Sequence, residues 1–161
     1  ERSYQSYMRY VKTKGNDRSE PDQAALREAN SGEMPDVRLT RARLLFDGGY
    51  YPRAYALLQG VGDAYKNNEK LELEYKYRLG RITDEMGKKQ DAIRLYTQTI
   101  DTGSGKPWYF ACSAALYLGI LYEQQGVREN ARAAYRRCLE IKPEEYAAGL
   151  HARAKAGMNR L

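Results

Sequence analysis

The chain of 161 residues is poor in the side chains that most often build metal sites and nucleophilic active sites. Cys112 and Cys138 are its two cysteines, too few for a disulfide framework or a cysteine-ligated metal cluster, so the redox compartment stays open. His151 is the single histidine, and no histidine-paired nucleophile or multi-histidine metal site can be built around it within this chain. We therefore expect no catalytic residues, no metal and no cofactor.

Long apolar stretches are missing as well. The purely apolar runs extend over only a few residues, which argues against a transmembrane segment in this sequence. No segment alternates strictly between apolar and polar residues, the pattern typical of a half-buried β-strand. Two Phe and one Trp accompany 15 Tyr. A tyrosine ring fills a helix interface while its hydroxyl reaches water, so most tyrosines are expected to pack inside a thin helical stack.

Charge does not single out a partner. The net charge is +6, and residues 126–161 carry eight positive and four negative groups. This basic end suits acidic partners or anionic surfaces, although a solvated helix face explains it equally well. Arg128, Arg132 and Arg136 form a stripe at i, i+4 spacing, with Arg137 beside them. Because no exposed aromatic residues are interleaved with it, the stripe is only weak evidence for a nucleic-acid partner, and we do not expect one.

Small or turn-forming residues recur at one fixed shift along the chain. In each of four series the step is 38 residues and then 39. The series are Ala42, Gly80 and Gly119; Gly49, Gly87 and Gly126; Ala54, Ala92 and Ala131; and Leu58, Tyr96 and Tyr135. Four series with the same two steps indicate one structural unit repeated three times, which is typical of proteins that bind along a stacked helical surface.

Apolar periodicity and turn residues predict an all-α protein. We expect helices at residues 3–14, 21–30, 35–47, 51–65, 69–86, 89–101, 107–125, 128–141 and 144–159. Turns inside three helical hairpins are predicted at Gly48-Gly49, Gly87-Lys88 and Gly126.

The third unit carries the most complete motif. It reads Leu118-Gly119-Ile120-Leu121-Tyr122, followed by Gly126, Ala131, Tyr135 and Pro143. This resembles the tetratricopeptide repeat, whose pattern is Leu-Gly-x-x-Tyr on a first helix, then Gly, Ala and an aromatic, with a closing Pro. The second unit keeps Leu79-Gly80, Gly87, Ala92 and Tyr96 but has Thr83 where tyrosine is usual. In the first unit Arg41-Ala42 replaces Leu-Gly, and Leu45 and Leu58 replace the aromatics.

The resemblance implies a right-handed superhelical stack of antiparallel helical hairpins, a tetratricopeptide-like α-solenoid. Three hairpins would occupy residues 35–143, at about 35–66, 69–103 and 107–143, with a capping helix in residues 144–161. Residues 1–34 would form N-terminal helices of a truncated or degenerate upstream repeat. Since the chain opens at Glu1 without a methionine, we expect a soluble piece of a longer protein and leave its compartment open.

The resemblance also implies a binding surface, because in this family the first helices of successive repeats line a concave groove for a peptide or partner helix. The corresponding positions are Arg43, Asp47, Tyr77, Arg81, Asp84, Leu116, Ile120 and Glu123, with Leu39 and Gln124 beside them. Arg43 and Arg81 are suited to hold a carboxylate, and Leu116 and Ile120 to receive apolar side chains. No Asn or Lys occupies these positions, which argues against the clamp that some relatives use for a terminal carboxylate.

We therefore expect a non-enzymatic protein-interaction module that acts as an adaptor or assembly scaffold. Two alternatives are the regulatory end of a longer enzyme, and binding of RNA or another polyanion through the basic C-terminal third. Two short segments resemble known motifs. Asp101-Thr102-Gly103-Ser104 matches the catalytic tetrapeptide of aspartic proteases, and Gly103-Ser104-Gly105-Lys106 resembles part of a phosphate-binding loop. Both follow a predicted helix and lack the β-strands that such sites need, so we interpret both matches as chance. The identity of the protein or peptide partner and the oligomeric state stay open.

Overall fold

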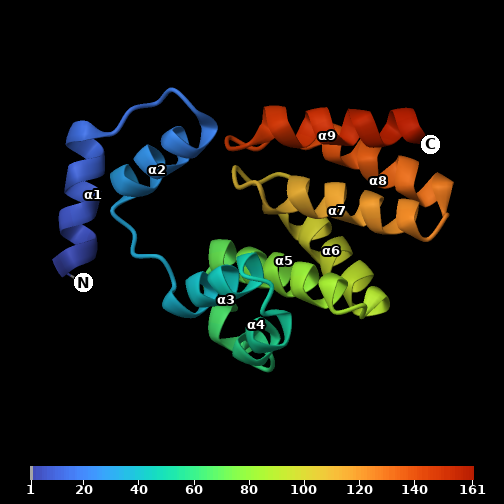
Figure 1. Cartoon of the computed structure of the whole chain (residues 1–161), viewed down its shortest axis with the longest axis horizontal. Helices are drawn as coiled ribbons and strands as arrows, with labels where there is room; N and C mark the ends of the chain where they lie inside the picture. The colour runs from blue at the N-terminus through green and yellow to red at the C-terminus, as the bar shows by residue number, and fades with distance from the viewer. Residues whose placement is uncertain (1) are drawn as a thin grey trace. The chain divides into compact units, whose positions relative to one another are not determined.

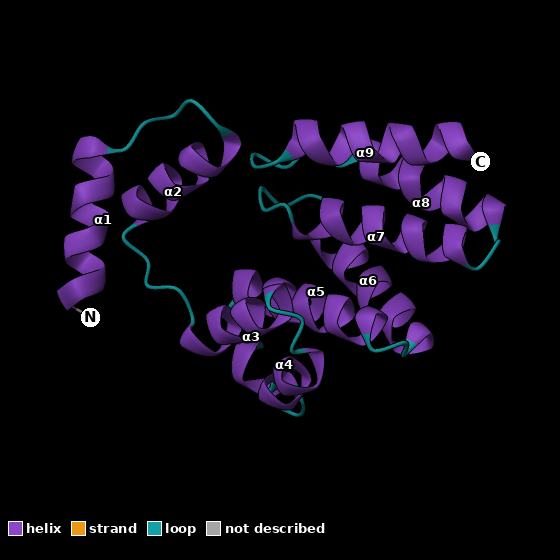
Figure 2. Cartoon of the chain, in the orientation of Figure 1, coloured by secondary structure: helices purple, strands orange, loops and turns teal. Residues whose placement is uncertain are grey.

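The structure, a computed structural model, describes residues 2–161, without the side chains of Glu20, Pro21 and Ala24. The chain divides into two compact units, Glu1–Pro35 and Asp36–Leu161. The described residues form nine α-helices and one short 3-10 helix, and no strand occurs among them (Figures 1 and 2). The all-α prediction is confirmed.

The first unit contains two helices, α1 (Arg2–Lys14) and α2 (Glu20–Ser31). The second begins with a capping box, because the Ser19 side chain accepts from the Asp22 backbone N–H while the Asp22 carboxylate accepts from the Ser19 backbone. Across the pair, the Tyr4 hydroxyl donates to the Glu28 carboxylate at 2.9 Å. That these helices are the remains of an upstream repeat stays a prediction.

The second unit is a series of helical hairpins followed by one further helix. Its elements are α3 (Val37–Asp47), α4 (Tyr51–Leu58), the 3-10 helix η1 (Gly62–Tyr65), α5 (Glu69–Glu85), α6 (Lys89–Gly103), α7 (Phe110–Gln124), α8 (Arg128–Glu140) and α9 (Ala147–Arg160). Helix α3 packs on α4, α5 on α6 and α7 on α8, while α9 packs on both α7 and α8. The first helices of successive hairpins also meet, α3 against α5 and α5 against α7. This is the predicted stack of helical hairpins (Figure 1).

Each hairpin turn places a glycine in the left-handed region of backbone space. The φ angles are 78° at Gly49, 74° at Gly87 and 73° at Gly126. A side chain is strained there, so glycine is the residue that ends a first helix and lets the chain reverse within a few residues. The recurring glycines of the sequence therefore mark the hairpin turns.

The helix predicted at residues 51–65 is wrong in its second half. Helix α4 ends at Leu58, Gly60 takes a left-handed φ of 74°, and the chain resumes as the 3-10 helix. Tyr75 of α5 fixes this break, because its hydroxyl donates to the Leu58 carbonyl at 3.1 Å. Its ring also packs closely against Gly62, since a Cβ added at Gly62 would lie 2.9 Å from it. A tertiary contact thus ends the helix earlier than local periodicity predicts.

Two later helices begin three residues after their predicted starts. Helix α7 starts at Phe110 rather than at residue 107, and α9 starts at Ala147 rather than at residue 144. The two loops hold each other, because the Glu144 backbone N–H donates to the Pro107 carbonyl at 2.8 Å. Tyr146 takes a left-handed φ of 58° and packs its ring edge-on against Tyr109, with 5.2 Å between centroids.

The core of the last hairpin is built around one tyrosine ring between two glycines. Tyr135 of α8 is fully buried. A Cβ added at Gly119 of α7 would lie 2.5 Å from this ring, and one added at Gly157 of α9 would lie 2.4 Å from it. The second hairpin repeats the pair more loosely, since a Cβ on Gly80 would lie 3.0 Å from the buried ring of Tyr96. The small residues therefore let aromatic rings fill the space between close helices.

Gly119→Ala is expected to destabilise the protein, because the added methyl group has no room against the Tyr135 ring. Overpacking costs about 1–3 kcal/mol, which exceeds the ~1 kcal/mol that alanine gains over glycine in a helix. Thermal unfolding followed by circular dichroism should show a Tm lower by about 2–6 °C.

Gly80→Ala is the matched control, and its looser 3.0 Å approach to Tyr96 predicts a smaller loss. Adding Tyr135→Leu to Gly119→Ala should make the two changes less than additive, because the clash partner is removed. A Gly119→Ala protein as stable as the wild type would contradict this packing.

Candidate functional site

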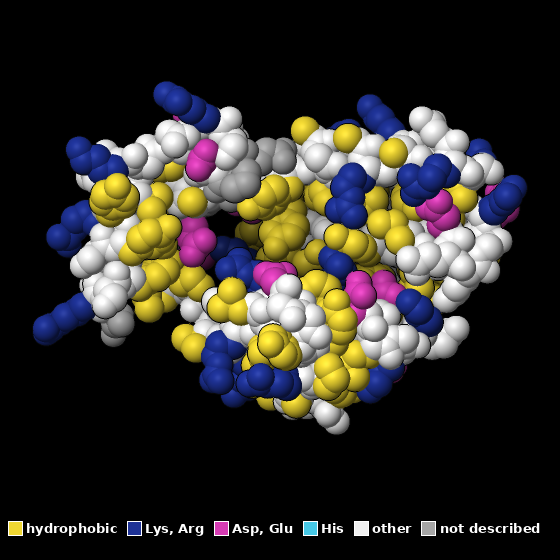
Figure 3. Space-filling model, in the orientation of Figure 1, with side chains coloured by type: hydrophobic (Ala, Val, Ile, Leu, Met, Phe, Trp, Pro, Cys, Tyr) yellow, Lys and Arg dark blue, Asp and Glu magenta, His cyan; other side chains and the backbone are white. Residues whose placement is uncertain are grey.

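Five of the predicted site residues lie on one surface, which we name the α3–α5–α7 face. It consists of Arg43, Phe46 and Asp47 of α3, Tyr77 and Arg81 of α5, and Tyr117 and Ile120 of α7. Successive first helices meet along this surface, so side chains from different hairpins lie next to one another. In Figure 3, hydrophobic side chains gather where α5 approaches α7, with basic and acidic side chains at the edges.

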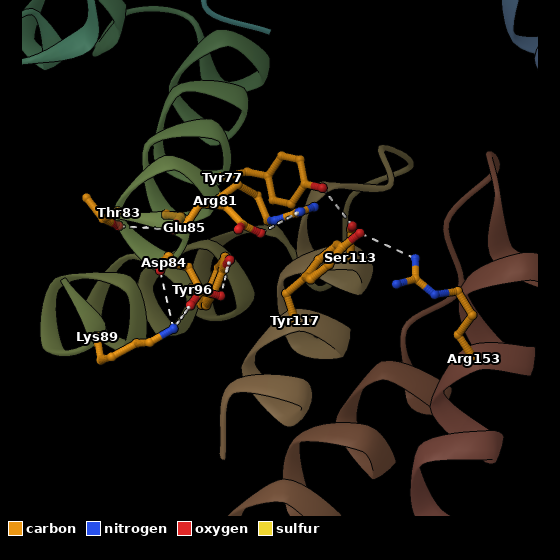
Figure 4. Close-up of polar contacts among 11 residues, drawn as sticks. Tyr77, Arg81, Thr83, Asp84, Glu85, Lys89, Tyr96, Ser113, Tyr117 and Arg153 are labelled. Carbon is orange, nitrogen blue, oxygen red and sulfur yellow. Dashed lines mark hydrogen bonds and ion pairs between the residues drawn. The ribbon is translucent and has the colours of Figure 1, made fainter. Parts of the chain in front are cut away.

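Four predicted residues are brought together around one cavity of about 170 Å³. They are Arg43, Asp47, Tyr77 and Arg81. Both α3 residues are exposed, whereas the Tyr77 side chain is buried and only part of it faces the cavity. The Tyr77 hydroxyl lies 2.9 Å from that of Ser113 on α7, and this hydrogen bond fixes the ring (Figure 4).

Two residues expected to face the groove do not reach it. Leu116 is fully buried and Leu39 is 1% exposed, so the prediction that they face a partner is wrong. Helix α7 is covered by α5, α6, α8 and α9, and every residue from 110 to 116 is buried. Alignment to the family pattern identifies the correct helix, α7. It predicts that Leu116 is accessible, whereas the accessible residue is the next one, Tyr117.

The remaining predicted residues are engaged within the protein. Asp84 accepts hydrogen bonds from Lys89 at 2.8 Å and from Tyr96 at 3.2 Å. Glu123 pairs with Arg160 of α9 through two hydrogen bonds of 2.8 and 2.9 Å, and it also accepts one from Tyr135. Asp84 thus joins α5 to α6, and Glu123 joins α7 to α8 and α9. Ile120 is half-buried against the main core, and Gln124 is exposed.

Arg81 lies at the centre of the face. Its guanidinium carbon lies 3.4 Å from the Tyr117 ring centroid and 4.9 Å from that of Phe46, so it bridges α3 and α7 by cation–π contacts. Phe46, Arg81 and Tyr117 thus form a row of stacked side chains, which Arg153 of α9 extends. The Arg153 guanidinium carbon lies 5.2 Å from the Tyr117 ring centroid, and one of its nitrogens lies 3.4 Å from the Tyr117 hydroxyl. Figure 4 shows Tyr117 between the two arginines.

The surroundings of Arg81 and Tyr117 shift the pKa values of both side chains. Burial lowers the pKa of Arg81, but the oxygens of Tyr77 and Tyr117 raise it to above the ordinary value. For Tyr117, burial raises the pKa, and the two neighbouring guanidinium groups lower it by more, so its net pKa falls below that of a free tyrosine. An arginine that stays charged while packed between rings offers its N–H edge to an anion.

Several residues of the site were not predicted from the sequence. Phe46, Arg78 and Tyr109 line the cavity, and Tyr117 and Arg153 complete the row of stacked side chains. Phe46 follows Arg43 by three residues, so helical spacing alone indicates that the two share a face. Nothing local marks Tyr109, because its place depends on how the loop before α7 meets the loop before α9.

A stack of helical hairpins whose first helices share one surface defines an α-helical repeat protein. Residues 116–145 match the family model of the tetratricopeptide repeat, so the predicted resemblance is confirmed for this segment, in the third hairpin. Such repeats generally serve as protein-interaction modules or scaffolds rather than as enzymes. Neither a curated protein nor a solved structure matches the chain significantly.

Neither a metal-binding cluster nor a membrane-spanning helix occurs in the part of the chain that the structure describes. Within it, no three or more His, Cys, Asp or Glu side chains are grouped so that they could hold a metal ion. None of the helices described between Arg2 and Arg160 is long and apolar enough to cross a membrane.

Glu123→Gln is expected to lower the Tm at neutral pH, because Glu123 joins α7 to α9. Hydrogen bonds from Arg160 and from Tyr135 lower the pKa of Glu123 below its ordinary value of 4.5. A carboxyl whose folded pKa is depressed stabilises the protein above its unfolded pKa, and this contribution is lost as the pH falls through the folded pKa. The Tm difference between wild type and variant should therefore shrink below pH 4.5.

Glu129→Gln is the matched control, since Glu129 is exposed on α8 and makes no ion pair with the described residues. Its Tm should follow the wild type at every pH. A Glu123→Gln penalty that persists unchanged at low pH would contradict an ionic role for this side chain.

Proposed function

We propose that this protein binds a peptide segment of another protein along the α3–α5–α7 face and acts as an adaptor or scaffold. The observation that carries the proposal is the cavity between α3 and α5, because it places side chains from two successive hairpins around one accessible hollow. The general interaction role of tetratricopeptide repeats supports the same use. Repeat proteins of this architecture present extended surfaces that read several side chains of a partner.

Binding of RNA through the basic stripe on α8 has less support. Arg137 donates to Glu140 at 3.1 Å and to Ser104 at 3.0 Å, so its charge is partly compensated. Arg132 is half-buried. The stripe thus presents fewer free cations than its sequence suggests, and a phosphate backbone requires several.

The proposal is tested by selecting a displayed library of random twelve-residue peptides on the intact protein. Selected peptides should bind the Arg43→Glu variant about tenfold more weakly or worse. Arg43 is exposed at the cavity, and the reversed charge would repel the acidic groups of a peptide that the arginine attracts. Binding is measured by fluorescence anisotropy, and circular dichroism checks that helical content is unchanged.

The matched control is Arg136→Glu, an equal charge reversal at an exposed position of α8. It should leave the affinities within about twofold of the wild type. Selected peptides that lose affinity equally with both variants would refute the assignment to the α3–α5–α7 face, as would a selection that yields no binding peptide.

A further inference from the structure

The size of the cavity limits what can fill it. Its volume of about 170 Å³ is smaller than the roughly 300–1,000 Å³ typical of small-molecule and cofactor sites. A single side chain of a partner suits this space better than a whole ligand does.

The apolar wall of the cavity is held in place before any partner arrives. Tyr77 and Tyr109 meet edge-on with 5.9 Å between ring centroids, and Tyr109 meets Tyr146 in the same way at 5.2 Å. The rest of this wall is Ala42, Phe46 and Ile82. Preformed aromatic walls favour an apolar occupant, because the wall side chains lose little conformational entropy when it binds.

The rim of the cavity is positively charged. Arg43 and Arg81 stand on it with Arg78, whose Nε donates to Glu74 at 2.7 Å. Among the described residues, the carboxylate paired with Arg81 is that of Glu85 at 3.8 Å, and the buried Nε of Arg81 has no hydrogen-bond partner there. A buried donor of this kind gains free energy when an acceptor reaches it.

The nearby carboxylates do not balance these arginines. Asp84 is neutralised by Lys89, and Glu123 by Arg160. Asp47 is the one acidic residue among those that line the cavity, and it is exposed. Charge complementarity therefore points to an anionic partner.

We infer that the cavity receives one large apolar side chain of an acidic peptide segment, whose carboxylates bind Arg43 and Arg81. The inference rests on the proposed function and names the chemistry of the peptide. A protein segment fits better than RNA, because bases stack on open aromatic faces. Here the guanidinium of Arg81 lies against the rings of Phe46 and Tyr117.

Three fluorescein-labelled dodecapeptides test the inference by anisotropy on the intact protein. The first alternates glutamate and serine around one central phenylalanine, the second replaces the phenylalanine with serine, and the third replaces every glutamate with lysine. The first should bind, and the other two should each bind at least about tenfold more weakly, a difference of 1.4 kcal/mol. A labelled oligouridylate of twelve nucleotides should bind more weakly than the first peptide.

Two variants with opposite expected effects on affinity identify the site. Arg43→Ala should weaken binding of the first peptide about fivefold, whereas Asp47→Asn should tighten it by a similar factor because a repulsive charge is removed. Arg136→Ala, on α8, should change nothing. Both cavity positions are exposed, so these changes leave the core intact.

The inference is overturned if the lysine peptide or the oligouridylate binds as well as the first peptide. A loss of affinity in Asp47→Asn overturns it too. So does a failure to detect binding of the first peptide at millimolar concentrations of the protein. The proposed function survives if the library still yields peptides sensitive to Arg43→Glu. It falls together with the inference only if no selected peptide depends on that residue.

Discussion

The structure depends on close approach between helices at residues without a side chain. The ring of Tyr135 lies against Gly119 on one helix and Gly157 on another, at distances that leave no space for a methyl group. One ring thereby joins three helices, α7, α8 and α9. Tyr96 against Gly80 joins the two helices of the preceding hairpin, α5 and α6, with a wider spacing. The second and third hairpins are closed in this way, and the first helices of all three hairpins pack against one another to form a shared face.

Arg81 contributes to the stability of that face and belongs to the proposed binding surface. Arg81 contacts Phe46 of the previous hairpin and Tyr117 of the next one, so it contributes to the stacking of three repeats. Arg81 also lines the cavity, and the oxygens of Tyr77 and Tyr117 raise its pKa above the ordinary value. Asp84 is meanwhile paired with Lys89 of its own hairpin, and Glu123 with Arg160 of α9. The positive charge of the face is thus a consequence of which side chains the fold has already paired.

Local patterns in the sequence predict the fold well and the site in part. The glycine series locates the hairpin turns, because a left-handed φ is a property of one residue and its neighbours. Accessibility is different, since it depends on every element packed around a helix. Leu116 is therefore misplaced, and Tyr117, one residue later, is missed. The role of Tyr109 likewise arises from two loops that are distant in the sequence.

The central claim is that side chains from successive first helices act together as one binding surface. Side-chain Nε–Hε signals of arginine, recorded by NMR during titration with an acidic peptide that carries one phenylalanine, test this most directly. The account predicts that the Arg81 signal moves together with backbone amides of α3, α5 and the start of α7. The Arg136 signal should stay in place. Shifts confined to α6 and α8, with Arg81 unmoved, would contradict the account.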